Sequence, residues 1–467
     1  MQKAYFDIQK LKLNAARIVI QEEKDQYENN AFLPYLENYL DLHYLLITED
    51  LKAYQELSGQ ESKRLDILSK LPDNSPYKRF LQAEIRLHWA FIKLKFGNNV
   101  SGAWEIIKAF RLLEDNRKKF PNFTPTLKSL GLLHVLVGSI PDNFAWVAQI
   151  LGLKGNIEGG IRELRQVQKE EPFFRQEAEL IDLLLHAYTL KPSPTQLTRI
   201  RQLPEEQRDN LLLHFFATTT LMKEAKSEDA LKILKEAPTG QAYIPFPFLQ
   251  YLEGEILLQE GKYQQAAAGY LSFLKKYRGF NYVKDTYLKL FMCMWLDNKE
   301  QEARTYMQKV AGAGKTIIEA DQLAHRLATE YLEGKLDASQ KPLYQARYAT
   351  DGGFLKKALT IINSVSESSF NTPEEKSEFF YRKGRILQKM EQSEQAIPLY
   401  NRTLQFTESG SRGFAASAAL QLGYIYRDKS DRAKATFYFK KAMSFKKHEY
   451  KNSIDNKAKA ALTELGA

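Results

Sequence analysis

The sequence of 467 residues contains only one cysteine and no long apolar run. Cys293 lies in the apolar stretch LFMCMWL, which excludes an intramolecular disulfide framework and predicts a buried thiol. No segment reaches the roughly 18–20 uncharged apolar residues of a membrane-spanning helix, and the first residues are polar and periodic. We therefore expect a water-soluble protein. It is cytoplasmic as the sequence stands, or exported or periplasmic if a signal peptide has been removed.

Groupings of residues typical of catalysis or metal binding are also lacking. The seven histidines are scattered singly, without a second His or Glu at metal-ligand spacing. The segment 311–316, AGAGKT, is similar to a phosphate-binding loop, but Lys309 stands where that motif needs a glycine, and helical periodicity precedes it. We expect an inter-helix turn there, no cofactor, no metal and no enzyme. A nucleotide-dependent enzyme using Lys315 is the least favoured hypothesis.

Apolar residues recur at helical spacing almost throughout the chain, and no alternating pattern of β-strands persists beyond a few residues. The pattern predicts an all-α fold. Alanines at the closing position of a helix hairpin recur with spacings of 36, 37, 55, 38 and 39 residues, at Ala230, Ala266, Ala303, Ala358, Ala396 and Ala435. This period is slightly longer than the ~34 residues of a tetratricopeptide unit. We therefore expect an α-solenoid of tetratricopeptide-like helix hairpins with a superhelical course.

The last repeat shows the pattern most clearly, and we expect its Gly423 and Ala435 to lie face to face. The spacing of 55 residues predicts an additional helix at about Thr316 to Tyr331. The chain is expected to divide into an N-terminal helical cap (1–75), a helical module with a Gly/Pro motif (76–190) and tetratricopeptide-like repeats (191–467).

The middle module has a pattern of its own, in which glycine-bearing apolar helices flank a Ser-hydrophobic-Pro break and a Gly-hydrophobic-x-Gly turn. The residues are Gly131, Ser139, Ile140, Pro141, Gly152, Leu153, Gly155, Gly160 and Leu164. This pattern resembles the family of the inclusion-body-clearance protein and tetratricopeptide repeat protein thirty-nine. The resemblance implies a structural role for these glycines and a proteostasis or lipid-linked function. Asn156 and Ile157 depart from the family pattern, where an acidic and then a basic residue are expected.

Function is expected to depend on the concave surface, which the first helix of each repeat lines. Counting from the packing positions gives a partner-binding groove of Tyr251, Glu255, Arg347, Tyr381, Arg385, Gln388, Tyr424 and Arg427. Tyr and Arg are frequent in binding hot spots, so the groove suits a protein or peptide partner, and an acidic one in particular. We expect a non-catalytic interaction or scaffold protein, with no nucleic-acid partner. The oligomeric state stays open.

A membrane-surface protein is the alternative. From Gln421 to Ala467 there are eleven Lys/Arg against five Asp/Glu, so the C-terminal end carries a formal charge of +6. Together with the apolar segment 130–153, this basic end could contact an anionic bilayer. Solvated terminal helices and a buried pair of helices are the simpler interpretation of both features.

Overall fold

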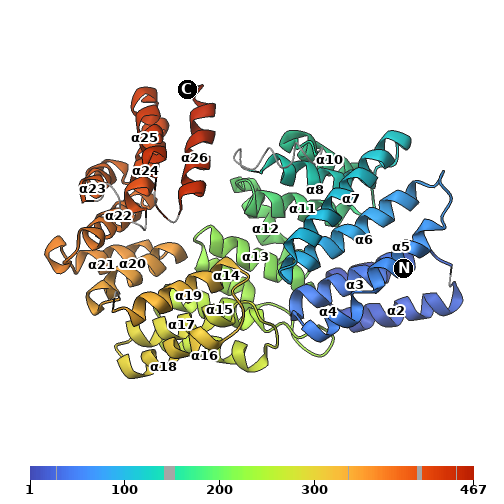
Figure 1. The fold of residues 1–467 in the computed structure, drawn as a ribbon, viewed down its shortest axis with the longest axis horizontal. Helices are drawn as coiled ribbons and strands as arrows, with labels where there is room; N and C mark the ends of the chain where they lie inside the picture. Colours follow the sequence, from blue (N-terminus) through green and yellow to red (C-terminus); the bar gives the residue numbers. More distant parts are fainter. Residues whose placement is uncertain are drawn as a thin grey trace.

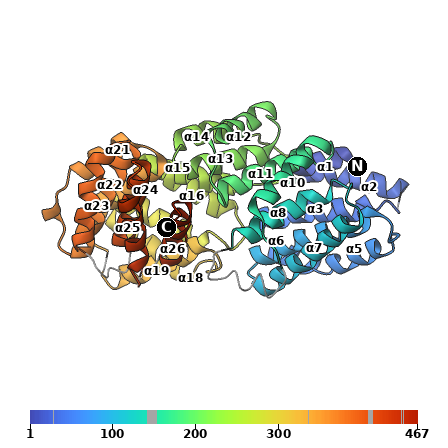
Figure 2. The same ribbon diagram turned by 90° about the horizontal axis from the view of Figure 1, so that it is seen from above.

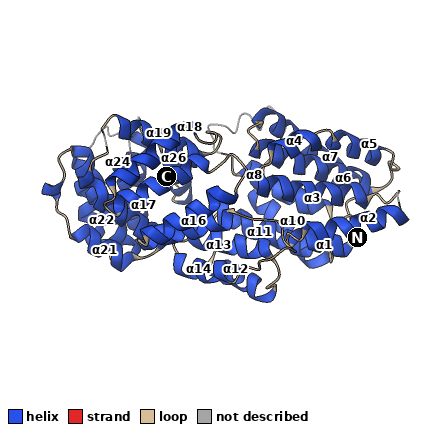
Figure 3. Ribbon diagram, turned by 90° about the horizontal axis from the view of Figure 1, so that it is seen from below, coloured by secondary structure: helices blue, strands red, loops and turns tan. Residues whose placement is uncertain are grey.

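The computed structural model describes residues 1–27, 29–140, 153–334, 336–406, 413–446, 448 and 450–466. Within these ranges every regular element is helical and no strand occurs (Figure 3). The prediction of an all-α superhelical repeat fold is confirmed.

The N-terminal helices share one buried core. They are α1 (Gln2–Gln9), α2 (Leu13–Gln26), α3 (Phe32–Thr48), α4 (Leu51–Leu57), α5 (Gln60–Ser69), α6 (Pro76–Lys95), α7 (Asn99–Lys119), α8 (Thr126–Gly138), α10 (Ile157–Glu170) and α11 (Arg175–Tyr188). Helix α6 pairs with α7, and α8 pairs with α10. Lys128 is enclosed in this core, with its Nζ 2.5 Å from Glu84 Oε2 and 3.0 Å from Glu177 Oε2. Two carboxylates thus compensate one buried ammonium.

Helix hairpins follow in the second part of the chain. Helix α12 (Pro194–Glu206) comes before them. The first hairpins are α13 (Leu211–Lys223) with α14 (Ser227–Lys235), α15 (Phe248–Glu260) with α16 (Tyr263–Lys276), and α17 (Val283–Leu296) with α18 (Glu300–Gly312). The later hairpins are α20 (Lys341–Gly352) with α21 (Leu355–Asn363), α22 (Pro373–Lys389) with α23 (Ser393–Phe406), and α24 (Phe414–Asp428) with α25 (Arg432–Ser444). Short 3₁₀ turns lie at Ala338–Gln340 and Glu367–Ser369. The six predicted alanines all fall on second helices and are at most 1% exposed.

Glycines on three of the first helices lie directly against aromatic rings of the second helices. A Cβ atom added to Gly423 would lie 2.5 Å from the ring of Phe439, sixteen residues further on. The same spacing joins Gly254 to Tyr270 and Gly384 to Tyr400. The Phe439 ring therefore fills the space that Gly423 leaves free, and the expected contact between Gly423 and Ala435 stays a prediction.

The predicted additional helix is confirmed as α19 (Glu319–Leu332), which packs on α17. It has no hairpin partner, and the next helix, α20, packs against α15. Gly353 ends α20 with a φ of +85°, and a Cβ atom there would lie 1.9 Å from the carbonyl oxygen of Ala225. Only glycine allows this approach of the α20 end to the turn between α13 and α14. The stack therefore turns back on itself after α19.

Two arms result from this course (Figure 1). Helices α1–α11 form one arm, and α20–α25 with the C-terminal helix α26 (Lys451–Glu464) form the other. Connections between the central helices α14–α17 bond to the first arm: the Ile244 N–H donates to the Leu11 carbonyl at 3.0 Å, and the Asn281 N–H donates to the Glu49 carboxylate at 3.0 Å. Seen from above, α26 lies on the inner side of the curve formed by α21–α25 (Figure 2).

Candidate functional site

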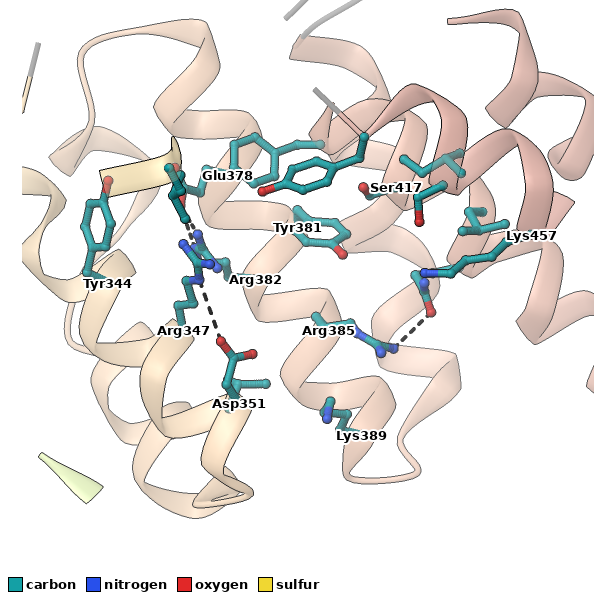
Figure 4. A pocket seen from close by; sticks show the side chains of 18 of the residues that line it. Tyr344, Arg347, Asp351, Glu378, Tyr381, Arg382, Arg385, Lys389, Ser417 and Lys457 are labelled. Atoms are coloured by element: carbon teal, nitrogen blue, oxygen red, sulfur yellow. Dashed lines mark hydrogen bonds and ion pairs between the residues drawn. The ribbon is translucent and has the colours of Figure 1, made fainter. Parts of the chain in front are cut away.

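A concave pocket of about 450 Å³ lies on the inner side of the C-terminal arm (Figure 4). Helices α19, α20, α22, α24 and α26 contribute its walls. Its volume falls in the range of ligand-binding pockets, roughly 300–1,000 Å³. The charged lining residues are Arg326, Glu330, Arg347, Asp351, Glu378, Arg382, Arg385, Lys389 and Lys457. Six cationic side chains therefore face three carboxylates.

Helix α22 supplies three of these cations because of its local sequence. Arg382, Arg385 and Lys389 have the spacing i, i+3 and i+7, which places them along one face of a helix. The helix starts at a capping box, in which the Glu375 N–H donates to Thr372 Oγ1 and the Glu375 carboxylate accepts from the Thr372 N–H. This start fixes the register that turns the basic face into the pocket.

Two of the cations have carboxylate partners within the pocket. Arg382 Nε lies 2.6 Å from Glu378 Oε1, one turn earlier on α22. Arg347 Nε lies 3.6 Å from Asp351 Oδ2, one turn later on α20. Figure 4 shows both pairs along one side of the pocket. These cations are largely compensated, so they shape the pocket wall more than its net charge.

Arg385 and Lys389 are held differently. Arg385 Nη1 donates to the amide oxygens of Gln388 and Gln421, both at 2.9 Å, and so its partners are neutral. Burial lowers the pKa of the Lys389 ammonium, and the neighbouring Arg385 guanidinium lowers it further. The pocket thus concentrates positive charge at the C-terminal end of α22.

An aromatic wall adjoins this basic part. The Tyr381 ring lies 5.6 Å from that of Phe414, measured between ring centroids, and both line the pocket. Tyr450, 44% exposed, and Ile454 complete the lining from the α26 side. A ligand in the pocket would therefore contact apolar surface and positive charge at once, as binding hot spots do.

The structure brings together three of the eight predicted groove residues: Arg347, Tyr381 and Arg385 line the pocket. Gln388 lies behind them, where its amide oxygen accepts from Arg385 and, at 2.6 Å, from the Tyr400 hydroxyl. Tyr424 and Arg427 lie outside the pocket, with the Arg427 guanidinium 5.0 Å from the Tyr424 ring centroid.

Tyr251 and Glu255 belong to a separate polar cluster between α15 and α17. Tyr251 is buried, and its hydroxyl donates to Asp285 Oδ2 at 2.5 Å. Glu255 Oε2 lies 3.0 Å from Lys289 Nζ. Tyr251 is therefore part of the interior of the repeats rather than an accessible groove contact, because its ring packs within the aromatic core.

Sequence reasoning missed Arg382, Lys389, Arg326 and Lys457. The first two could have been found, since basic residues recur at helical spacing along α22. Arg326 of α19 and Lys457 of α26 could not, because only the turn of the stack brings these helices to the pocket.

The Gly/Pro motif forms a close helix crossing where it is described. A Cβ atom on Gly131 of α8 would lie 2.7 Å from the Gly160 carbonyl oxygen of α10, and one on Gly155 would lie 2.1 Å from the Gly138 nitrogen. Ser139 Oγ donates to the Val135 carbonyl at 2.7 Å. Pro141 and Gly152 lie outside the described residues.

Other features singled out in the sequence are accounted for by packing. Leu130, Leu133 and Val135, from the apolar segment 130–153, are buried. Lys315 Nζ lies 4.6 Å from the Phe280 ring centroid, in the connection between α18 and α19. Cys293 is buried, which raises the pKa of its thiol.

The described parts of the chain offer neither a metal-binding cluster nor a membrane-spanning helix. They hold no group of three or more His, Cys, Asp or Glu side chains placed to bind a metal ion. Their helices also include none that combines the length and the apolar character needed to cross a bilayer.

Comparison with known proteins gives one family match and several distant structural likenesses. No curated protein matches the sequence. The APC/C hetero-tetramer Cut9-Hcn1 aligns at 14% identity over 99% of this chain and 89% of that chain, with a TM-score of 0.32. The apo form of the quorum sensor NprR from B. thuringiensis aligns at 15% identity over 86% of this chain and 96% of that chain, with a TM-score of 0.35. The TPR domain of P58(IPK) aligns at 13% identity over 89% of this chain and 96% of that chain, with a TM-score of 0.23. Residues 416–448 match the tetratricopeptide repeat family. The last hairpin, α24 and α25, is therefore a tetratricopeptide repeat that ends an all-helical, superhelical repeat fold.

Proposed function

We propose that this protein is a non-catalytic scaffold that binds a protein or peptide partner in the pocket of its C-terminal arm. The supporting observation is the convergence of Arg347, Tyr381 and Arg385, from two helices, on one concave pocket. Aromatic and arginine side chains in such a pocket provide large contact area and charge-assisted hydrogen bonds. Because cations outnumber carboxylates in the lining, we propose that the partner is acidic where it enters the pocket.

An affinity-capture experiment with Arg385→Glu tests this proposal. The variant inverts a charge inside the pocket, whereas Arg427→Glu makes the same change outside it and serves as the matched control. Partners recovered by wild type and Arg427→Glu, and lost by Arg385→Glu, would support the proposal. Equal recovery of every partner by all three proteins would contradict it.

We also propose a relationship to the inclusion-body-clearance and tetratricopeptide thirty-nine family, supported by the close Gly131–Gly160 crossing. The division into 1–75, 76–190 and 191–467 is retained as part of this proposal. Residues of 1–75 and 76–190 contribute to one buried core, so these two parts should unfold together. Hydrogen exchange measured on the full chain tests this, and separate exchange transitions for the two parts would contradict it.

Membrane-surface association is the second candidate, supported by the basic C-terminal end. Lys440 is exposed on α25 and available to an anionic surface, whereas Lys434, also exposed, pairs with Asp431 at 3.1 Å. The apolar residues described in 130–140 are mostly buried and offer little to a bilayer. Co-sedimentation with vesicles containing phosphatidylserine, at low and moderate salt, decides between the candidates. Absence of the protein from the vesicle pellet at both salt concentrations would eliminate this one.

A further inference from the structure

Three cations of the pocket lack a carboxylate partner. Among the described residues, no Asp or Glu oxygen lies within 4.0 Å of the cationic nitrogens of Arg385, Lys389 or Lys457. Arg385 donates to two amide oxygens, whereas Lys389 and Lys457 form no side-chain hydrogen bond with the described part of the chain. Figure 4 shows the three side chains on one side of the pocket, contributed by α22 and α26. They form a subsite of three positive charges with no contacting carboxylate among the described residues, here called the basic subsite.

Two carboxylates beyond ion-pair distance offset part of this charge, since Asp351 and Glu224 both raise the pKa of Lys389 against the effects of burial and Arg385. At the end of α13, burial lowers the pKa of Lys223, the neighbouring Glu224 raises it and Lys457 lowers it, so charges of both signs lie on that side. The compensated pairs of Arg347 and Arg382 lie on the opposite side, as Figure 4 shows. An anion that enters the pocket therefore meets an attractive field concentrated on one side.

The volume of the pocket limits what can enter it. A helix about 11 Å across, rising 1.5 Å per residue, fills roughly 140 Å³ per residue. The pocket of about 450 Å³ therefore encloses about three residues, which is less than one helical turn. The pocket therefore encloses only a short segment of a partner at one time.

We infer that the basic subsite receives two or more neighbouring carboxylates from a short acidic segment of the partner, while Tyr381 and Phe414 contact the adjoining residues. This inference rests on the proposed function and adds the chemistry of the recognised segment. A single carboxylate would leave two of the three cations unpaired, so clustered acidic residues match the site better than an isolated one. Charge-assisted pairs inside a pocket are also stronger than those on an open surface.

Selection of random peptides displayed on phage, against the immobilised full chain, tests the inference without knowledge of the partner. Four proteins are compared: wild type, Lys389→Gln/Lys457→Gln, Tyr381→Ala, and Lys356→Gln/Lys440→Gln. The last is the matched control, since it removes the same charge at exposed lysines on α21 and α25 that do not line the pocket. Thermal unfolding by circular dichroism verifies that each variant is folded.

The expected result is that wild type and the control enrich peptides with two or more neighbouring Asp or Glu residues, and that Lys389→Gln/Lys457→Gln does not. A selected peptide, measured by fluorescence anisotropy, should bind wild type at least tenfold more tightly than its Asn/Gln analogue. For Lys389→Gln/Lys457→Gln this ratio should shrink to near one, as a double-mutant cycle requires for a direct interaction.

Different failures have different meanings. If peptides depend on Tyr381 but their neutral analogues bind equally well, the inference about clustered carboxylates is refuted and the proposed function stands. If no selected peptide depends on Tyr381, the proposed function is refuted with it. If inorganic phosphate at millimolar concentration displaces the peptide where chloride at equal ionic strength does not, the subsite binds a small free anion, and the peptide inference is overturned.

Discussion

Asp285 should make the protein less stable as the pH rises through the acidic range. Burial raises the pKa of its carboxyl group from an ordinary value near 4 to about 6, despite the attraction of Lys289, and Glu255 and Asp321 raise it further. The folded state therefore binds the proton more tightly than the unfolded chain does. The resulting stabilisation is complete below pH 4 and is lost as the pH rises to about 6. A difference of about two pKa units corresponds to about 3 kcal/mol.

The substitution Asp285→Asn tests this reasoning, because an amide reproduces the shape of the neutral acid and can still accept from the Tyr251 hydroxyl. We expect the variant to equal wild type in stability near pH 3.5 and to exceed it by up to about 3 kcal/mol at pH 7. Urea midpoints measured at pH values from 3.5 to 7.5 give the difference. Asp66→Asn, at a side chain 72% exposed, is the control for loss of the charge alone. A difference that does not change with pH, or a less stable variant at pH 7, would refute the assignment.

Three further predictions concern packing and charge. Gly423→Ala should destabilise the last repeat by about 1–2 kcal/mol, because the clash of the new methyl group with the Phe439 ring costs more free energy than the higher helix propensity of alanine returns. A raised melting temperature would contradict this. Lys128→Met should cost about 3–5 kcal/mol by leaving Glu84 and Glu177 as uncompensated buried charges, and adding Glu84→Gln should recover part of the loss in urea unfolding. Lys389→Gln should leave the melting temperature unchanged or raise it, because it removes a partly desolvated cation beside Arg385; a clear decrease would show that Lys389 stabilises the fold.

The repeats could be predicted from the sequence because their signal is local. An alanine at a helix crossing and apolar residues at helical spacing are imposed by two helices adjacent in the chain. The six alanines were therefore located correctly, and the spacing of 55 residues indicated α19. The pairing of Gly423 with Phe439 was missed. Residue spacing alone does not say which of two candidate partners fills the space beside a glycine.

The site was predicted only in part, because it depends on how repeats stack. Counting along first helices gave Arg347, Tyr381 and Arg385, and the structure places these three around one pocket. The same count placed Tyr251 on that surface, although its hydroxyl is buried against Asp285. A residue on a first helix is accessible only where the stack leaves the concave side open. That condition depends on contacts between helices far apart in the sequence, such as α15 and α20.

The interruption of the repeat period is also what builds the pocket. Helix α19 adds Arg326 and Leu327 to the lining, and because it has no hairpin partner, the next hairpin turns and packs against α15. A regular repeat at this position would have placed another hairpin against α17, and α20 would have continued the stack. The most irregular interval in the sequence thus precedes the concave pocket of the C-terminal arm. Local departures from a repeating pattern are where function is expected in a chain whose regular parts are determined by packing.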